Sequence, residues 1–143
     1  MAAVLETLEQ EMARLVRVLE AVQRRRNYPL ERAQYLLLLH LEAAGPQPVR
    51  SLAEHLLLDD STVTRQVAAM EQAGLVRREP NPSDGRSSLI EATAEGMALM
   101  AQMRDMRLGR IAILFEGWDE AEKADLARLL TALNESLRRS IAE

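Results

Sequence analysis

The sequence predicts a mainly α-helical protein with a winged helix-turn-helix, a two-stranded β wing, and N- and C-terminal helices that dimerise. Three observations predict this fold class. Apolar residues recur at helical spacing through most of the 143 residues. Two predicted helices, at about 49–56 and 61–73, are joined by a turn of a few residues, which is typical of a helix-turn-helix. The stretch NPSDGRSSLIEAT, residues 81–93, then interrupts the helical pattern with turn-forming residues.

The first predicted helix, about Val4 to Arg25, carries a narrow apolar seam. Its residues recur at alternating steps of three and four: Leu5, Leu8, Met12, Leu15, Leu19 and Val22. Such a seam either packs on its own domain or pairs with another helix, and three heptads favour a partner helix. A second apolar stripe follows Asp119, the predicted cap of the last helix. It comprises Leu126, Leu129, Leu130, Leu133, Leu137 and Ile141.

The middle of the chain predicts the helix-turn-helix lobe. A helix from about Leu30 to Ala44 is apolar nearly all round and is expected to be buried. Gly74 is expected to end the helix from Ser61 in the left-handed conformation. We expect three segments: a dimerisation helix at 1–29, a DNA-binding lobe at 30–96 and further dimerisation helices at 97–143.

The interrupting stretch predicts the wing. The runs 75–79 and 87–92 are compatible with strands, and Asp84-Gly85 between them suits a hairpin turn. Thr93 is then a predicted N-cap for a helix that reaches about Phe115.

Composition narrows the function classes. The formal charge is -4 and the pI is about 5.3, so any contact with nucleic acid must be local. The absence of cysteine excludes disulfides, thiolate metal sites and thiol-based sensing. Aromatic residues make up only 3%, which disfavours stacking platforms for single strands. Without a signal-peptide pattern or a run long enough to cross a membrane, the expected location is cytoplasmic.

The helix from Ser61 has a polar outer face if Val63, Val67 and Met70 are buried. That face contains Ser61, Thr62, Arg65, Gln66, Ala69 and Gln72. Short side chains followed by long hydrogen-bonding ones suit entry into a major groove. The alternative is an ordinary solvated helix face. At the wing tip, Asp84 precedes Arg86 by two residues and is expected to hold its guanidinium beside DNA; the alternative is a plain turn with a surface charge.

These segments together resemble the MarR family of transcriptional regulators. The specific parts are STVTRQVAAMEQAGLVRR, which is similar to the family's recognition helix, and DGR, which matches its Asp-x-Arg wing signature. The resemblance implies a homodimeric repressor of an inverted-repeat operator, released by a small amphipathic or phenolic effector. It also implies roles for individual residues: Ser61, Thr62, Thr64, Arg65 and Gln66 at the major groove, Arg50 and Ser51 at phosphates, Arg78 at the wing base, and Asp84 orienting Arg86 in the minor groove.

Some positions depart from the family pattern. Leu57 stands in the turn where a small residue is common, and Ala92 replaces a usual leucine. Between Gln47 and Glu91 there are five arginines and seven acidic residues, among them Asp59 and Asp60 just before the recognition helix. We therefore expect DNA binding that is modest or unusually salt-sensitive, and a winged-helix protein-interaction module is the main alternative function.

Other candidate sites are weaker. Six residues are predicted to line an effector pocket between the terminal helices and the lobe: Tyr28, Tyr35, His40, Met106, Arg110 and Trp118. His40 and His55 are expected to be packed or surface histidines. No metal, cofactor or catalytic constellation is predicted, so an enzyme is not expected.

Overall fold

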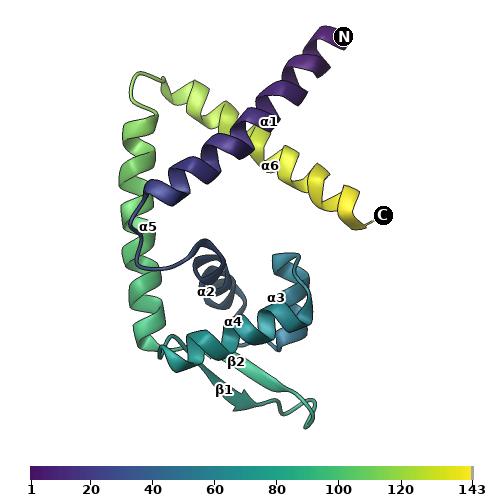
Figure 1. Cartoon of the computed structure of the whole chain (residues 1–143), viewed down its shortest axis with the longest axis vertical. Coiled ribbons are helices and arrows are strands. Elements are labelled where there is room, and N and C mark those ends of the chain that lie inside the picture. The colour runs from purple at the N-terminus through teal and green to yellow at the C-terminus, as the bar shows by residue number, and fades with distance from the viewer. Residues whose placement is uncertain (143) are drawn as a thin grey trace. The chain divides into compact units, whose positions relative to one another are not determined.

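The computed structural model describes residues 1–142. These residues form six helices and one two-stranded antiparallel sheet (Figure 1). In chain order the elements are α1 (Ala2–Arg25), α2 (Arg32–Ala44), α3 (Val49–Leu56), α4 (Asp60–Gln72), β1 (Val76–Pro80), β2 (Ser88–Ala92), α5 (Ala94–Leu114) and α6 (Glu120–Ala142). The chain divides into two compact units after Met103, within α5. The predicted fold class, a mainly α winged helix-turn-helix, is confirmed.

A single apolar core holds α2 to the first half of α5 together. Every element from α2 to the first half of α5 contributes to it, and the fully buried side chains are Leu37, Leu38, Leu52, Val63, Val67, Met70, Ile90, Met100 and Met103. The predicted burial of one α4 face is therefore confirmed. Because each element buries one apolar face against the others, the lobe has a core of its own, and its polar faces are left to the solvent.

The start of α2 shows why this helix begins later than predicted. Glu31 and Gln34 form a reciprocal capping box, in which the Glu31 N–H donates to Gln34 Oε1 at 3.0 Å. Leu30, predicted as helical, instead lies just before the cap and is buried in the core. Tyr35 is buried in the same core, so Leu30 and Tyr35 occupy the positions of a hydrophobic staple.

The helix-turn-helix consists of α3 and α4. Leu57 ends α3 in the left-handed conformation, with φ 60° and ψ 41°, and the next residue, Leu58, donates its N–H to the Ala53 carbonyl at 3.0 Å. Helix α4 begins at Asp60 rather than at Ser61, because the Asp59 side chain caps it. Ser61, the predicted first residue of this helix, is therefore its second residue.

The end of α4 follows the sequence prediction. Gly74 has φ +76°, the Leu75 N–H donates to the Met70 carbonyl at 2.9 Å, and the Gly74 N–H donates to the Glu71 carbonyl at 3.0 Å. These two bonds form a Schellman motif. Leu75 belongs to this cap, and consequently β1 begins one residue later than predicted.

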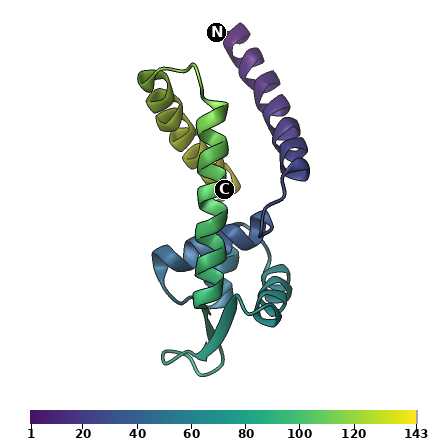
Figure 2. The same ribbon diagram turned by 90° about the vertical axis from the view of Figure 1, so that its left-hand side faces the viewer.

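The wing is the β1–β2 hairpin. Its register pairs Val76 with Ala92 and Pro80 with Ser88, and Gln47 adds an isolated bridge to Ile90 in the middle of β2. Because Ile90 is fully buried, the hairpin base is fixed to the core. Figures 1 and 2 show the loop between the strands projecting away from α2.

The start of α5 packs tightly on the end of α4. Thr93 caps α5 as predicted, accepting the Gly96 N–H at 3.0 Å, and its hydroxyl donates to the Gly74 carbonyl at 2.6 Å. A Cβ at Gly96 would collide with the Leu75 carbonyl, so this helix approaches as closely as glycine allows.

The long helices α1 and α6 contrast with the lobe, because neither contains a buried residue. Asp119 caps α6 as predicted: it accepts the Glu122 N–H at 2.8 Å, and its own N–H donates to Glu122 Oε1 at 3.0 Å. Most apolar stripe residues of both helices, such as Leu8 and Leu137, remain exposed, whereas Met12, Leu126 and Leu133 are half-buried.

Candidate nucleic-acid interface

Helix α4 presents a polar stripe to the solvent. Ser61, Arg65, Ala68 and Gln72 are all exposed and recur at helical spacing, opposite the buried Val63, Val67 and Met70. Thr64 is exposed beside the stripe, whereas Thr62 and Gln66 are half-buried at its margin. The residues predicted for the major groove therefore lie on one surface, with Ser61 and Arg65 at its centre.

A carboxylate organises the beginning of this stripe. Asp59 Oδ1 accepts the Thr62 N–H at 2.7 Å and the Ser61 hydroxyl at 2.9 Å. The pKa of the Asp59 carboxyl falls from 3.8 to about 2, because the carboxylate accepts hydrogen bonds from the Thr62 side chain, the Thr62 backbone and the Ser61 side chain. Asp59 is therefore negatively charged at any physiological pH.

Further side-chain hydrogen bonds form within the next turn of α4. The Thr64 hydroxyl donates to the Asp60 carbonyl at 2.7 Å, and Arg65 Nη2 lies 3.5 Å from Thr62 Oγ1. Arg65 keeps most of its hydrogen-bonding groups for a partner, because a guanidinium carries five N–H donors.

The predicted phosphate contacts on α3 lie close together. Arg50 is highly exposed and approaches Glu54 at 3.7 Å, a loose (i, i+4) pair. Ser51, the next residue, is half-buried. The structure thus places both at the start of α3, with Arg50 reaching into solvent.

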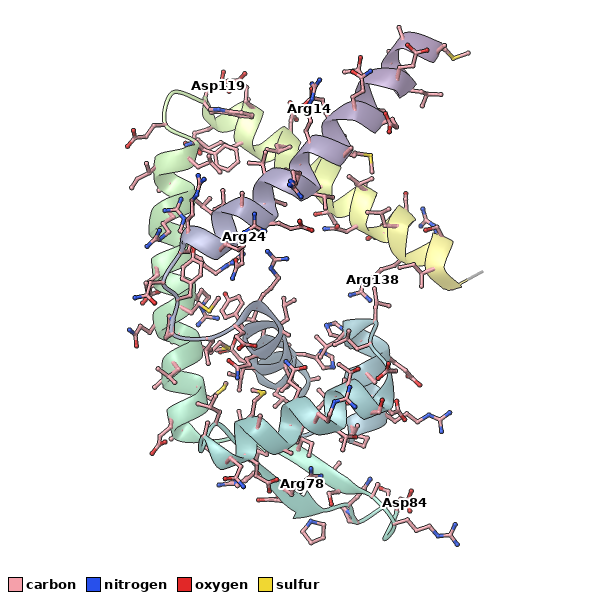
Figure 3. All side chains as sticks on the ribbon, in the orientation of Figure 1. Arg14, Arg24, Arg78, Asp84, Asp119 and Arg138 are labelled. Carbon is pink, nitrogen blue, oxygen red and sulfur yellow. The ribbon has the colours of Figure 1, made fainter. Side chains whose placement is uncertain are left out.

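Two arginines brace the base of the wing, and Figure 3 labels one of them, Arg78. Arg78 Nε donates to Glu71 Oε1 at 3.0 Å and links β1 to α4. Arg77 binds Glu91 at 3.0 Å across the hairpin and Glu79 at 3.2 Å on its own strand. The hydrogen bond that Arg77 donates to the Glu91 carboxylate is the main reason that the pKa of Arg77 is raised. The Arg78–Glu71 contact lies at the wing base, and the part of Arg78 in DNA binding stays a prediction.

The wing tip differs from the sequence prediction. Asp84 Oδ1 accepts the backbone N–H of Arg86 at 3.0 Å, and the ion pairs among residues 1–142 do not include an Asp84–Arg86 pair. An Asp side chain readily bonds a backbone N–H two residues on, as it does here. In this structure Asp84 thus orders the turn from which Arg86 extends and leaves the guanidinium itself unheld.

Sequence reasoning missed two residues that shape this interface. Asn81 Oδ1 accepts the Ser83 N–H at 3.0 Å, and its Nδ2 donates to Ser87 Oγ at 2.9 Å, so it closes the loop from inside. An Asn before Pro82 is a turn signal that points to such a role. The other is Glu71, whose partner Arg78 lies on a different element, which no local pattern reveals.

Ion pairing sorts the five arginines between Gln47 and Glu91. Arg50, Arg77 and Arg78 are paired with acidic residues, whereas in the part of the chain that the structure describes Arg65 and Arg86 form no ion pair. Four of the seven acidic residues, Glu54, Glu71, Glu79 and Glu91, are occupied by those pairs. Between Gln47 and Glu91 the two unpaired cations of the described chain therefore lie on α4 and at the wing tip.

The six residues predicted for an effector pocket fall in both units. Tyr28, Tyr35 and His40 belong to the first unit and Met106, Arg110 and Trp118 to the second. Tyr35 is a core residue, and the His40 ring stacks on that of His55 at 3.7 Å. Trp118 is 45% exposed and packs edge-on against Phe115 at 5.0 Å. The pocket stays a prediction, because two shallow hollows on the surface, one lined by Ala68, Ala69, Glu71 and Gln72 and the other by Glu20, Gln23, Arg24, Glu31 and Arg32, include none of the six.

Neither a metal-binding cluster nor a membrane-spanning helix is found in residues 1–142. Residues 1–142 contain no group of three or more His, Cys, Asp or Glu side chains arranged to hold a metal ion. None of the helices in the same range has the length and apolar character needed to span a membrane.

Helices α3 and α4 pack on the core, and α4 exposes a polar face. A braced hairpin with an arginine at its tip follows. This arrangement defines a winged helix-turn-helix DNA-binding protein. Comparison with known proteins agrees. The residue pattern of the MarR family matches residues 30–88. The chain is 38% identical over 133 residues to the uncharacterized HTH-type transcriptional regulator YxaD of Bacillus subtilis, covering 92% of this chain and 93% of YxaD.

Solved structures support the same assignment. A MarR family protein from Bacillus stearothermophilus is 25% identical with a TM-score of 0.74, over 92% of this chain and 96% of its own. The PcaV transcriptional regulator from Streptomyces coelicolor, in complex with its natural ligand, is 23% identical with a TM-score of 0.67, over 91% of each chain. The chain belongs to the MarR family and is a DNA-binding transcriptional regulator.

Proposed function

We propose that this regulator is a homodimeric repressor that binds an inverted-repeat operator. Helix α4 enters the major groove through Ser61, Thr62, Thr64, Arg65 and Gln66, and the wing places Arg86 in the adjacent minor groove. The observation that carries this proposal is the pairing of the arginines. Arg65 and Arg86 are the unpaired cations between Gln47 and Glu91 in the described chain, and they lie on the two elements that would meet DNA.

Dimerisation supplies the second half of the site. The stripe residues Leu5, Leu8, Leu15 and Leu19 of α1 and Leu129, Leu130, Leu137 and Ile141 of α6 are between 40% and 66% exposed in the single chain. Covering these stripes with a second copy removes apolar surface from water. Two-fold symmetry then places two α4 helices in successive major grooves, about 34 to 36 Å apart.

An effector would act by changing that spacing. We propose that a small amphipathic or phenolic molecule is the effector, with PcaV and its natural ligand as a precedent within the same fold. The sequence contains no cysteine, so release of DNA by thiol oxidation is excluded for this chain. Action on chromosomal DNA implies a cytoplasmic location.

Selection from random duplex DNA at physiological salt, followed by footprinting on the region upstream of the protein's own gene, tests the proposal. We expect an inverted repeat with half-sites about one helical turn apart. Affinity should fall with salt by a slope of about 0.9 per phosphate contact. Selection of no motif, with binding only at low salt, would contradict the proposal.

One observation favours a second candidate, a winged-helix module that binds a protein instead of DNA. Asp59 and Asp60 are exposed at the start of α4, where phosphates would approach, and seven acidic residues outnumber five arginines between Gln47 and Glu91. Purification with a specific protein partner, together with the absence of any selected DNA motif, would favour this alternative.

A further inference from the structure

The hydroxyl groups on the outer side of α4 already donate their protons within the protein. Ser61 Oγ donates to Asp59 Oδ1 at 2.9 Å, and Thr64 Oγ1 donates to the Asp60 carbonyl at 2.7 Å. A hydroxyl has a single proton and two lone pairs. Each of these exposed oxygens therefore faces the solvent as a hydrogen-bond acceptor.

The acceptor state of Ser61 is strongly fixed by Asp59. The same Oδ1 atom also accepts the Thr62 N–H at 2.7 Å, so the carboxylate is held in place by the helix that it caps. A phosphate that approached Ser61 would have to take its proton from Asp59 and would meet the negative charge of that carboxylate. Ser61 is thus poorly suited to a phosphate contact and well suited to a partner that donates.

Base edges in the major groove offer a limited set of donors. Cytosine presents its N4 amino group and adenine its N6 amino group, whereas guanine and thymine present acceptors at O6, N7 and O4. Arg65 lies one turn further along the same exposed stripe and carries donors only. Four residues of helix span about 6 Å, roughly two base pairs, so the two side chains can face nearby positions of one half-site.

Resting on the proposed function, we propose that Ser61 is a specificity-determining residue that reads the amino group of a cytosine or an adenine. Asp59 is the positioning residue that keeps the Ser61 hydroxyl in its accepting orientation, and Arg65 reads a guanine within about two base pairs. The chemistry of the half-site is therefore an amino-bearing base edge next to a guanine.

The test compares selection from random duplex DNA by the wild-type protein, Ser61→Ala and Asp59→Gly. We expect the wild type to prefer one base pair at the position that Ser61 reads. Ser61→Ala should weaken that preference by about 3- to 10-fold and leave the neighbouring guanine unchanged. Asp59→Gly removes the carboxylate that holds the Ser61 proton, at little cost to the helix cap, and should weaken the same preference. Thermal unfolding of each variant controls for folding.

A chemical change in the DNA completes the test. A duplex whose selected cytosine or adenine lacks the amino group should bind the wild type about 3- to 10-fold more weakly and should bind Ser61→Ala with unchanged affinity. Unchanged affinity of the wild type for the duplex without the amino group, or a Ser61→Ala motif identical to the wild type, would overturn the inference while leaving the proposed function intact. Selection of no motif by the wild type would overturn both.

Discussion

The winged lobe and the terminal helices α1 and α6 use similar apolar residues in different ways. In the lobe, leucines such as Leu37, Leu38 and Leu52 are fully buried by elements of the same chain. In α1, Leu8 and Leu19 have the same spacing rules but are 51% and 50% exposed. An apolar stripe predicts that one face of a helix will be buried, but only the surrounding structure decides which element buries it. The apolar faces of the lobe are buried by other elements of the same chain, whereas most stripe residues of the terminal helices are exposed in the single chain.

Among the variants considered, removal of a core leucine should cause the largest change, a loss in the free energy of unfolding of the lobe. We expect Leu38→Ala, at a position with 0% exposure, to lower the free energy of unfolding of the lobe by about 2 to 5 kcal/mol, because it leaves a cavity among close-packed neighbours. Hydrogen exchange of α2, α3 and α4 measures this loss. The matched change Leu19→Ala should leave exchange of those helices unchanged. Equal losses from both would place α1 in the same cooperative unit as the lobe.

A charge on the α1 seam should break association while the lobe stays folded. We expect Leu19→Asp to weaken dimerisation by more than about 10-fold, because an unpaired carboxylate would have to leave water at the interface. Sedimentation over a range of protein concentrations measures this. Gln10→Asp adds the same charge to an exposed residue outside the seam and serves as the control. Similar dimer affinities for the two variants would mean that the seam is not the interface.

Arginines of the lobe and of α1 should also differ in how much they contribute to operator affinity. Arg86→Ala should reduce operator affinity by about 10-fold, since a charge-assisted contact is lost at the wing tip. Arg25→Ala, at the exposed end of α1, should change it by less than about 2-fold. Titration of labelled operator duplex measures both, and equal effects would remove the wing from the binding surface. Unfolding curves for the two variants should overlay that of the wild type.

A smaller change should stabilise the lobe. Leu57 is the non-glycine residue with positive φ among residues 1–142, and it is 48% exposed, so little packing compensates for its strained backbone. We expect Leu57→Gly to raise the free energy of unfolding by about 1 kcal/mol, measured by chemical denaturation. Leu58→Gly is the matched control and should be destabilising. A loss of stability in Leu57→Gly would show that the leucine side chain has a packing role there.

The smallest expected effect is an acid transition at the start of α4. The pKa of Asp59 is about 2 in the folded protein, below its ordinary value of 3.8. Since the folded state favours the carboxylate, its contribution to stability is complete above about pH 3.8 and is lost as the pH falls through about 2. Carbon-13 NMR of the carboxyl group gives the pKa directly. In Asp59→Asn the helix content should no longer change with pH over the same window. An Asp59 pKa near 3.8 would contradict the hydrogen-bond geometry.

Most of the fold was predictable because its signals are local. The Gly74 end of α4, the Thr93 cap of α5 and the Asp119 cap of α6 each depend on residues within a few positions, and all three are confirmed. The errors in boundaries are local as well. Helix α4 begins at Asp60 and not at Ser61. Three consecutive residues, Asp59, Asp60 and Ser61, can each cap a helix, and the sequence pattern alone did not choose among them.

The exposed face predicted for α4 is present in the structure, the contacts around it were predicted incompletely, and its role in binding DNA stays a prediction. The exposed stripe of α4 follows from helical spacing once Val63, Val67 and Met70 are buried. The bond expected between the Asp84 carboxylate and the Arg86 guanidinium is replaced by one to the Arg86 backbone, because the turn itself brings that N–H within reach.

The sequence by itself determined the helices, the hairpin and the apolar stripes, since periodicity and capping act over a few residues. Only the tertiary structure decided which charges are left for a partner. The Arg78–Glu71 pair joins different elements, and the Arg77–Glu91 pair joins residues 14 positions apart. Such pairs form only after the core has placed β1 beside both α4 and β2, because side-chain electrostatics depends on distances in space and not on separation along the chain.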